Sequence, residues 1–96
     1  MARFALVIHP RLPKELKALQ RAGRGDVVRR IMGSLRLLEE DPLRQRSGLD
    51  IKRLAAKGGV VFRLRVGDYR VLYEVDSQTR TVFVTTLFHR GRGYRE

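Results

Sequence analysis

The sequence contains no cysteine and no tryptophan, and histidine occurs only twice, at His9 and His89. The absence of cysteine excludes disulfides, thiolate catalysis and every zinc site that needs sulfur. Because the two histidines lie far apart in the chain, we expect no metal centre and no cofactor.

Long apolar runs are also absent, since Phe4–Ile8 and Val60–Phe62 are the longest and both are far too short to span a bilayer. The first residues do not form a signal-peptide pattern, because only five apolar residues follow Arg3. We therefore expect a cytoplasmic protein that does not act in a membrane.

Acidic residues are scarce, with 10 Asp and Glu against 21 Lys and Arg, which gives a formal net charge of +11. Such a charge favours polyanionic partners and predicts steep salt dependence of binding. It does not distinguish RNA, DNA, an anionic membrane or an acidic protein. With 96 residues, the chain is expected to form one domain, 1–96.

The pattern of apolar residues changes once along the chain, near residue 43. Before that point, Phe4–Ile8 predicts a strand, and two helical stripes follow it, formed by Leu12, Leu16 and Leu19 and then by Val27, Ile31, Leu35 and Leu38. Gly23 and Gly25 separate the two helices, and Asp41-Pro42 ends the second. These elements predict an α-hairpin behind an N-terminal strand.

Residues 43–58 carry no clear pattern, and we assign them no strand or helix. Three segments rich in Val, Phe, Tyr and Thr then predict strands at Val60–Val66, Tyr69–Asp76 and Arg80–Phe88. The order predicts an α+β fold, in which three antiparallel strands and the N-terminal strand form one sheet with the helices packed on one face.

The dipeptide Gly67-Asp68 predicts a two-residue hairpin turn, which sets Val66 opposite Tyr69 and Arg65 opposite Arg70. One face of the sheet then carries Leu64, Val66, Tyr69, Val71 and Tyr73, a suitable surface for the helices. The other, which we call the arginine face, carries Val61, Arg63, Arg65, Arg70, Leu72 and Glu74.

Two interpretations of the arginine face remain open. Like charges opposite each other destabilise a sheet, so Arg65 and Arg70 are either solvated separately or held ready for an anion. Arg63 has a structural alternative, an ion pair with Glu74 on the diagonal.

The position of the last strand depends on its turn. A three-residue loop, Ser77–Thr79, sets Arg80 opposite Asp76 and Thr86 opposite Arg70. It thereby places Val82, Val84, Thr86, Phe88 and Arg90 on the arginine face. A two-residue loop would place His89 there instead.

The stretch from Phe62 to Val75, with Gly67-Asp68-Tyr69-Arg70 at its centre, resembles the hallmark segment of the RelE/ParE superfamily of toxins. The ending Leu87-Phe88-His89-Arg90 followed by Tyr94 is similar to that superfamily's C-terminal motif. The resemblance covers essentially the whole chain and implies the same α+β layout, in a single RelE-like domain.

The resemblance also implies roles for individual residues. Arg70 matches the central catalytic arginine, Arg65 and Arg63 match basic positions on the preceding strand, and Arg90 and Tyr94 match the C-terminal arginine and tyrosine. On this basis the expected catalytic residues are Arg65, Arg70, Arg90 and Tyr94, and the expected RNA-binding residues are Arg63, Lys52, Arg53, Lys57 and His89.

The sequence departs from the RelE pattern at Val61, where some members carry a lysine proposed as the general base. Lys57, Tyr94 or His89 would have to replace it, because an arginine is a poor base at neutral pH.

The resemblance implies a ribosome-dependent endoribonuclease that cuts mRNA in the ribosomal A site. Two alternatives remain: a ParE-like inhibitor of DNA gyrase without RNA chemistry, and a catalytically inactive basic binding module. The expected partners are the ribosome, mRNA and a cognate antitoxin whose neutralising segment is acidic. That segment is expected to be an extended chain with an amphipathic helix, lying on the α-hairpin or over the basic surface.

Overall fold

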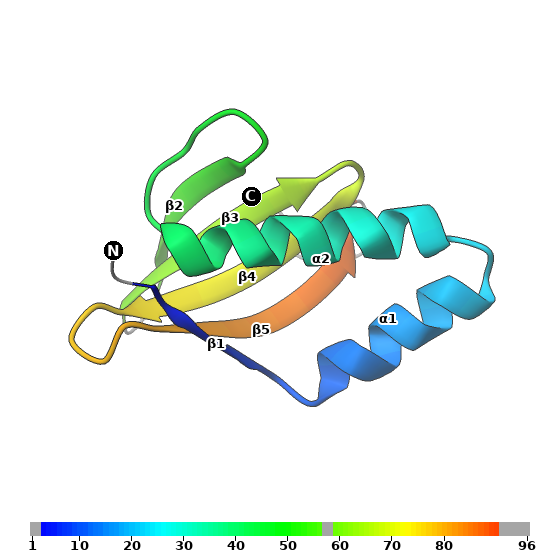
Figure 1. Ribbon diagram of the computed structural model, residues 1–96, viewed down its shortest axis with the longest axis horizontal. Helices are drawn as coiled ribbons and strands as arrows, with labels where there is room; N and C mark the ends of the chain where they lie inside the picture. The colour runs from blue at the N-terminus through cyan, green and yellow to red at the C-terminus, as the bar shows by residue number, and fades with distance from the viewer. Residues whose placement is uncertain (1–2, 57–58, 91–96) are drawn as a thin grey trace.

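The computed structural model describes residues 3–56 and 59–90. In chain order the elements are β1 (Ala5–Ile8), α1 (Arg11–Arg21), α2 (Gly25–Glu40), β2 (Asp50–Ala56), β3 (Gly59–Val66), β4 (Tyr69–Asp76) and β5 (Thr81–His89). The strands form one sheet in the order β1-β5-β4-β3-β2. Figure 1 shows both helices on the same side of this sheet, with α2 lying in front of the strands and running nearly along them. The expected α+β layout is therefore confirmed.

The sheet is mixed, because β1 runs parallel to β5 whereas the other neighbours are antiparallel. Between β1 and β5 the chain forms two helices on one face and the other three strands. This connection is long enough for β5 to run in the same direction as β1. The N-terminal strand thus closes one edge of the sheet, and β2 closes the other.

The core lies between the helices and one face of the sheet. Leu12 of α1 and three residues of α2, Ile31, Leu35 and Leu38, are fully buried against it. They meet Leu64, Val66, Val71 and Tyr73 of the central hairpin, the residues that the Gly67-Asp68 register assigns to this face. The hairpin register is confirmed, with Val66 opposite Tyr69 and Arg65 opposite Arg70.

The strand β2 corrects our assignment of residues 43–58, to which we gave no element. It pairs antiparallel with β3 over its whole length. Its sequence contains Asp50 and Lys52, residue types that are depleted in strands. Charged side chains are tolerated here because β2 is an edge strand, and such residues protect an edge from further pairing.

The start of β5 also differs from the expectation. The turn after β4 has four residues, 77–80, and pairs Asp76 with Thr81, so Arg80 does not oppose Asp76. Arg80 itself has a φ of 53°, in the left-handed region. Local turn chemistry did not indicate this conformation, since glycine or asparagine is the usual residue there.

A β-bulge between Leu72 and Tyr73 then changes the register a second time. Leu72 pairs with Thr86 and Tyr73 with Val84, which leaves Thr85 as the extra residue on β5. The extra residue reverses which side chains of β5 point to each face of the sheet on the two sides of the bulge. Val82 and Val84 are therefore buried on the helix side, contrary to our prediction, whereas Thr86 and Phe88 lie on the arginine face as predicted.

Tyr73 connects the sheet to the end of α2. Its ring is fully buried and stacks on Phe62, with centroids 5.5 Å apart, and its hydroxyl donates a 2.6 Å hydrogen bond to the Pro42 carbonyl. Burial raises the pKa of the Tyr73 hydroxyl well above its ordinary value, and this effect outweighs the opposing influence of Arg46.

We expect this hydroxyl to contribute a pH-dependent part of the stability. The raised pKa means that the unfolded chain ionises first, so the contribution is complete below about pH 10 and is lost as the pH rises above it. Tyr73→Phe should cost about 1–3 kcal/mol at neutral pH, because the buried Pro42 carbonyl loses its donor. The difference between the two proteins, measured by denaturant unfolding, should shrink above about pH 10. A difference that stays constant to high pH would contradict this account.

Candidate functional site

The arginine face is organised in rows that run across the strands. Asp50 of β2 pairs with Arg65 of β3, Arg65 with Arg70 of β4, and Arg70 with Phe88 of β5. Cross-strand partners point to the same face, and neighbouring strands are about 4.8 Å apart. The four strands therefore present one carboxylate, two guanidinium groups and an aromatic ring in line. We call this set the Asp50–Phe88 row.

A second row lies beside the first, formed by Lys52, Arg63, Leu72 and Thr86. The two rows are joined by an ion pair on the diagonal, in which Arg63 Nη2 lies 2.9 Å from Asp50 Oδ1. The alternative partner that the sequence left open for Arg63, Glu74, does not form this contact. Because Asp50 belongs to the strand that we did not predict, it could not have been considered as a partner.

The arginines on this face differ in exposure. Arg65 is exposed, and its side chain makes no hydrogen bond or ion pair within the part of the chain that the structure describes. Arg63 and Arg70 are each only 9% exposed. The Nη1 atom of Arg70 lies 3.4 Å from the carbonyl oxygens of Gly67 and Tyr69, at the limit of a hydrogen bond. The idea that both opposed arginines are simply solvated is wrong for Arg70.

The other basic residues of the predicted site divide between the two faces. Lys52 pairs with Arg63 and so belongs to the arginine face. Arg53 pairs with Phe62, whose ring stacks on the buried Tyr73, and Arg53 is therefore on the helix side of the edge strand. The structure brings Lys52 into the basic cluster and leaves Arg53 out of it.

The end of β5 separates two further candidates. His89 pairs with Tyr69 on the helix side, where the two rings meet edge to face with centroids 5.1 Å apart. His89 therefore does not join Arg65 and Arg70. The backbone N–H of Arg90 donates a 2.7 Å hydrogen bond to the Asp68 carbonyl, which extends the ladder by one residue. Because β5 ends at His89, the alternation of the strand does not assign the Arg90 side chain to either face.

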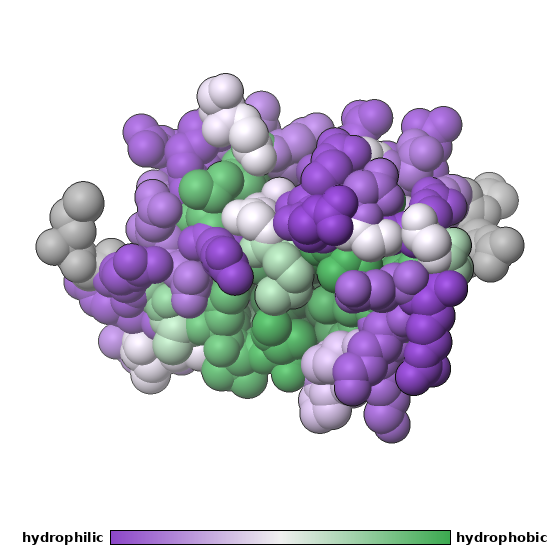
Figure 2. Space-filling model, turned by 45° about the vertical axis from the view of Figure 1, so that its right-hand side comes forward, coloured by the Kyte–Doolittle hydropathy of each residue, from purple (hydrophilic) through white to green (hydrophobic). Residues whose placement is uncertain are grey.

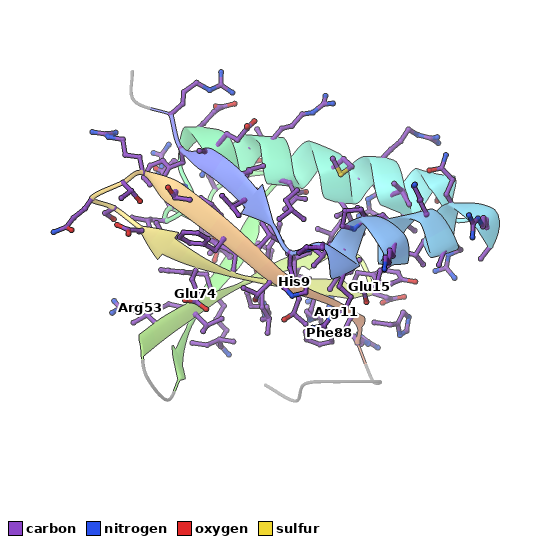
Figure 3. All side chains as sticks on the ribbon, turned by 90° about the horizontal axis from the view of Figure 1, so that it is seen from below. His9, Arg11, Glu15, Arg53, Glu74 and Phe88 are labelled. Atoms are coloured by element: carbon purple, nitrogen blue, oxygen red, sulfur yellow. The ribbon has the colours of Figure 1, made fainter. Side chains whose placement is uncertain are left out.

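Tyr94 and Lys57, which we also expected in the site, lie outside the described residues. Figure 3 shows Phe88 and Glu74 on the side of the sheet away from α2. Glu74 pairs with Phe83, and Phe83 pairs with Val7 at the far edge of this face. Within residues 3–56 and 59–90, no group of His, Asp and Glu side chains is placed to hold a metal ion.

An open pocket lies at the Asp50 end of the row. It has a volume of about 390 Å³, and its lining consists of Gln45, Arg46, Gly48, Leu49, Asp50 and Arg65. Arg46 is held in place because its guanidinium donates to the carbonyls of Leu37, Asp41 and Arg44 at the end of α2. Sequence reasoning missed this pocket together with β2, and only the period-two alternation of Ile51 with its charged neighbours could have indicated it.

No helix in the described part of the chain is long and apolar enough to cross a membrane. In Figure 2, hydrophobic residues form an area in the centre and lower part of the surface, and hydrophilic residues surround it. Val7 and Phe83, which pair with each other across β1 and β5, are 48% and 40% exposed.

Comparisons with known proteins agree with the fold. Residues 6–94 match the sequence model of a family described as the ParE toxin of the type II toxin–antitoxin system parDE. No curated protein matches the chain.

Three solved structures are similar. The archaeal RelE–RelB complex from Pyrococcus horikoshii contains a chain with 31% identity and a TM-score of 0.75, covering 97% of this chain and 100% of that one. The toxin–antitoxin complex RelBE2 from Mycobacterium tuberculosis gives 26% identity and a TM-score of 0.64, over 92% and 99% of the two chains. A mutant of the Escherichia coli toxin RelE in the free state, at 22% identity and a TM-score of 0.54 over 96% and 86%, shares the fold.

The family match covers nearly the whole chain, and the fold is that of the RelE chains in these complexes. The sequence motif around Arg70 lies on the strand where the hairpin register places it. This chain therefore belongs to the RelE/ParE superfamily of toxins from type II toxin–antitoxin pairs.

Proposed function

We propose that this toxin is a ribosome-dependent endoribonuclease that cuts mRNA in the ribosomal A site, acts in the cytoplasm and is neutralised by a cognate antitoxin. The observation that carries the proposal is the pair Arg65 and Arg70, held side by side at the centre of the arginine face. Two like charges in adjacent strand positions are unfavourable unless an anion lies between them. The backbone of an RNA strand supplies such an anion.

The chemistry required is attack by a 2′-hydroxyl on the adjacent phosphate. The transition state carries extra negative charge on the phosphate oxygens, and guanidinium groups bind such oxygens in pairs. Arg65 and Arg70 would stabilise this charge, and Lys52 would hold a neighbouring phosphate. By the family resemblance, Arg90 and Tyr94 would complete the catalytic set.

A ParE-like inhibitor of DNA gyrase is the second candidate function. It is favoured by one observation, the match of residues 6–94 to a family described as ParE toxin. Such an inhibitor needs a protein-binding surface and not a row of phosphate-binding groups. We rank it second because the exposed charge on the arginine face has no use in that role.

Controlled expression in a bacterial host separates these functions. Mapping of mRNA 5′ ends should reveal new ends phased with codons, and the number of gyrase–DNA breaks should stay at the level of an empty vector. Intact mRNA with accumulating gyrase–DNA breaks would support the ParE-like function instead. Intact mRNA without growth arrest would indicate a catalytically inactive binding module.

The antitoxin proposal rests on charge and on exposed apolar surface. Two of the similar structures are toxin–antitoxin complexes, and this chain has a formal net charge of +11. An acidic segment would meet that charge, and an amphipathic helix within it would cover apolar surface such as Figure 2 shows. Co-expression of the neighbouring reading frame should restore growth if that frame encodes the antitoxin.

Binding to RNA should depend steeply on salt. If Lys52, Arg65 and Arg70 each neutralise one phosphate of a single strand, the slope of log K against log salt should be about −2. Arg65→Ala should reduce the magnitude of that slope by about 0.7, because one contact is lost. The measurement is fluorescence anisotropy with a short oligonucleotide at several salt concentrations. An unchanged slope would show that Arg65 does not contact a phosphate.

A further inference from the structure

The arginine face contains a carboxylate that the family resemblance does not assign to the site. Asp50 stands in the same row as Arg65 and Arg70, one strand beyond Arg65. Its side chain is 46% exposed and its Oδ1 atom is held by Arg63 Nη2 at 2.9 Å. The other oxygen, Oδ2, accepts no hydrogen bond from any residue that the structure describes.

We propose that Asp50 is the general base that removes the proton from the attacking 2′-hydroxyl. This inference rests on the proposed ribonuclease function. The chain needs such a group because Val61 stands where some RelE-like toxins carry a lysine proposed for this task. Lysine and arginine side chains are ordinarily protonated at neutral pH, whereas a carboxylate is ready to accept a proton.

The other described candidates lie in less suitable places. His89 is on the opposite side of the sheet, against Tyr69. Glu74, the second carboxylate on the arginine face, is four residues along β4 from Arg70, which corresponds to about 13 Å. Asp50 is separated from Arg65 by a single strand spacing of about 4.8 Å.

The order of residues in the Asp50–Phe88 row also predicts the direction in which the RNA strand would bind. The pocket of about 390 Å³ next to Asp50, lined in part by Gln45, Leu49 and Arg65, would receive the nucleotide that carries the attacking 2′-hydroxyl. Its phosphate would lie over Arg65 and Arg70, one and two strands further along the row. The following nucleotide would then lie toward Phe88, whose aromatic ring can stack on a base.

The proposed step balances without any further reactant. Asp50 Oδ2 takes the proton of the 2′-hydroxyl, and an electron pair of the 2′-oxygen forms a bond to phosphorus. The bond from phosphorus to the 5′-oxygen breaks, and that oxygen leaves with the electron pair and takes a proton from water. The products are a 2′,3′-cyclic phosphate and a 5′-hydroxyl, and the proton on Asp50 returns to the solvent.

The ion pair with Arg63 gives the carboxylate a fixed orientation. Arg63 is itself buried to nine-tenths and flanked by Arg65 in the same strand, so its guanidinium has little freedom to move away. A general base held in this way is oriented before the substrate arrives, which is a condition for efficient proton transfer.

The test compares Asp50→Asn with Glu74→Gln in single-turnover cleavage of mRNA on purified ribosomes. Both variants remove one carboxylate from the arginine face, so they match in charge. We expect Asp50→Asn to lower the rate by ~10² or more and Glu74→Gln to leave it within about threefold. Wild-type rates for Asp50→Asn would overturn the assignment of the base and leave the ribonuclease function intact. Absence of cleavage by the wild-type protein would instead contradict the proposed function.

A second measurement separates a base from a residue that only positions Arg63. In Asp50→Ala, small carboxylates added to the buffer can enter the space left by the side chain. If Asp50 is the base, rescue by acetate should exceed rescue by formate, and formate should exceed chloroacetate, following their basicity. Equal rescue by all three would assign Asp50 a positioning role and overturn the proposal.

Thermal unfolding will show whether the Asp50 variants fold. If they do not, the pH dependence of cleavage by the wild-type protein still tests the proposal. A carboxylate base gives a cleavage rate that is level from about pH 6 to pH 9, since it is ionised throughout. The charged groups that face Asp50 are Arg63 and Arg65 from β3 and Lys52 from its own strand. A rate that rises about tenfold per pH unit would indicate an amine or phenol base and overturn the proposal.

Discussion

Replacing Arg65 and Arg70 together by alanine should lower mRNA cleavage on the ribosome by ~10² or more. Both guanidinium groups lie on the same face of one pair of strands, so their removal would take away the charge that stabilises the transition state of the proposed reaction. The measurement is single-turnover cleavage at equal protein concentration, with the 5′ ends of the products mapped. The effect should fall mainly on the rate at saturating ribosome and less on the concentration needed for half-saturation.

The two single variants should differ in stability, because the two side chains differ in burial. Arg65 is exposed, and Arg65→Ala relieves a like-charge repulsion of roughly 0.2–1 kcal/mol, so the melting temperature should stay level or rise. Arg70 is only 9% exposed, and Arg70→Ala also removes packing of its aliphatic stem. Arg70→Lys keeps that stem and should restore folding but only part of the activity, since lysine cannot bind a phosphate with two parallel hydrogen bonds.

A control that matches the single variants in charge is available on the other side of the molecule. Arg36 is exposed on α2, and Arg36→Ala removes one positive charge without touching the sheet. Cleavage by this variant should equal that of the wild type. Full ribosomal cleavage by the double variant of Arg65 and Arg70 would contradict the catalytic interpretation of the arginine face and favour the gyrase-directed function.

The central hairpin was predictable because one local feature determines its register. Gly67 has a φ of 58°, a conformation that glycine adopts without strain, and the turn it begins has two residues. Once the turn is known, alternation assigns every side chain of β3 and β4 to a face. The buried Leu64, Val66 and Val71 and the opposed Arg65 and Arg70 all follow from it.

The two edges of the site were not predictable in the same way. The strand β2 owes its pairing to β3, and its own sequence has little preference for a strand. The bulge at Thr85 depends on how β5 packs against β4, and no turn residue or glycine indicates it. Asp50 was not placed in the site because β2 was not predicted. Val82 and Val84 were placed on the wrong face because the bulge was not predicted.

The same alternation leads to a large expected effect on stability. Leu64 lies between Arg63 and Arg65 in β3, but its side chain points to the helix face and is fully buried. Leu64→Ala should destabilise the fold by about 2–5 kcal/mol, because it removes buried apolar contacts and leaves a cavity. For a domain of this size, each kcal/mol corresponds to roughly 4–8 °C, so the melting temperature should fall by at least about 8 °C.

Leu64→Ala and Arg65→Ala therefore form a pair that separates the two faces of one strand. The leucine variant should be much less stable, yet cleave at a rate close to that of the wild type at a temperature where it is folded. The arginine variant should be as stable as the wild type and cleave poorly. Thermal unfolding and single-turnover cleavage at low temperature measure both quantities on the same samples. If instead Leu64→Ala abolished cleavage while still folded, the arginine face would depend on core packing, because a cavity beneath β3 would then move the guanidinium groups above it.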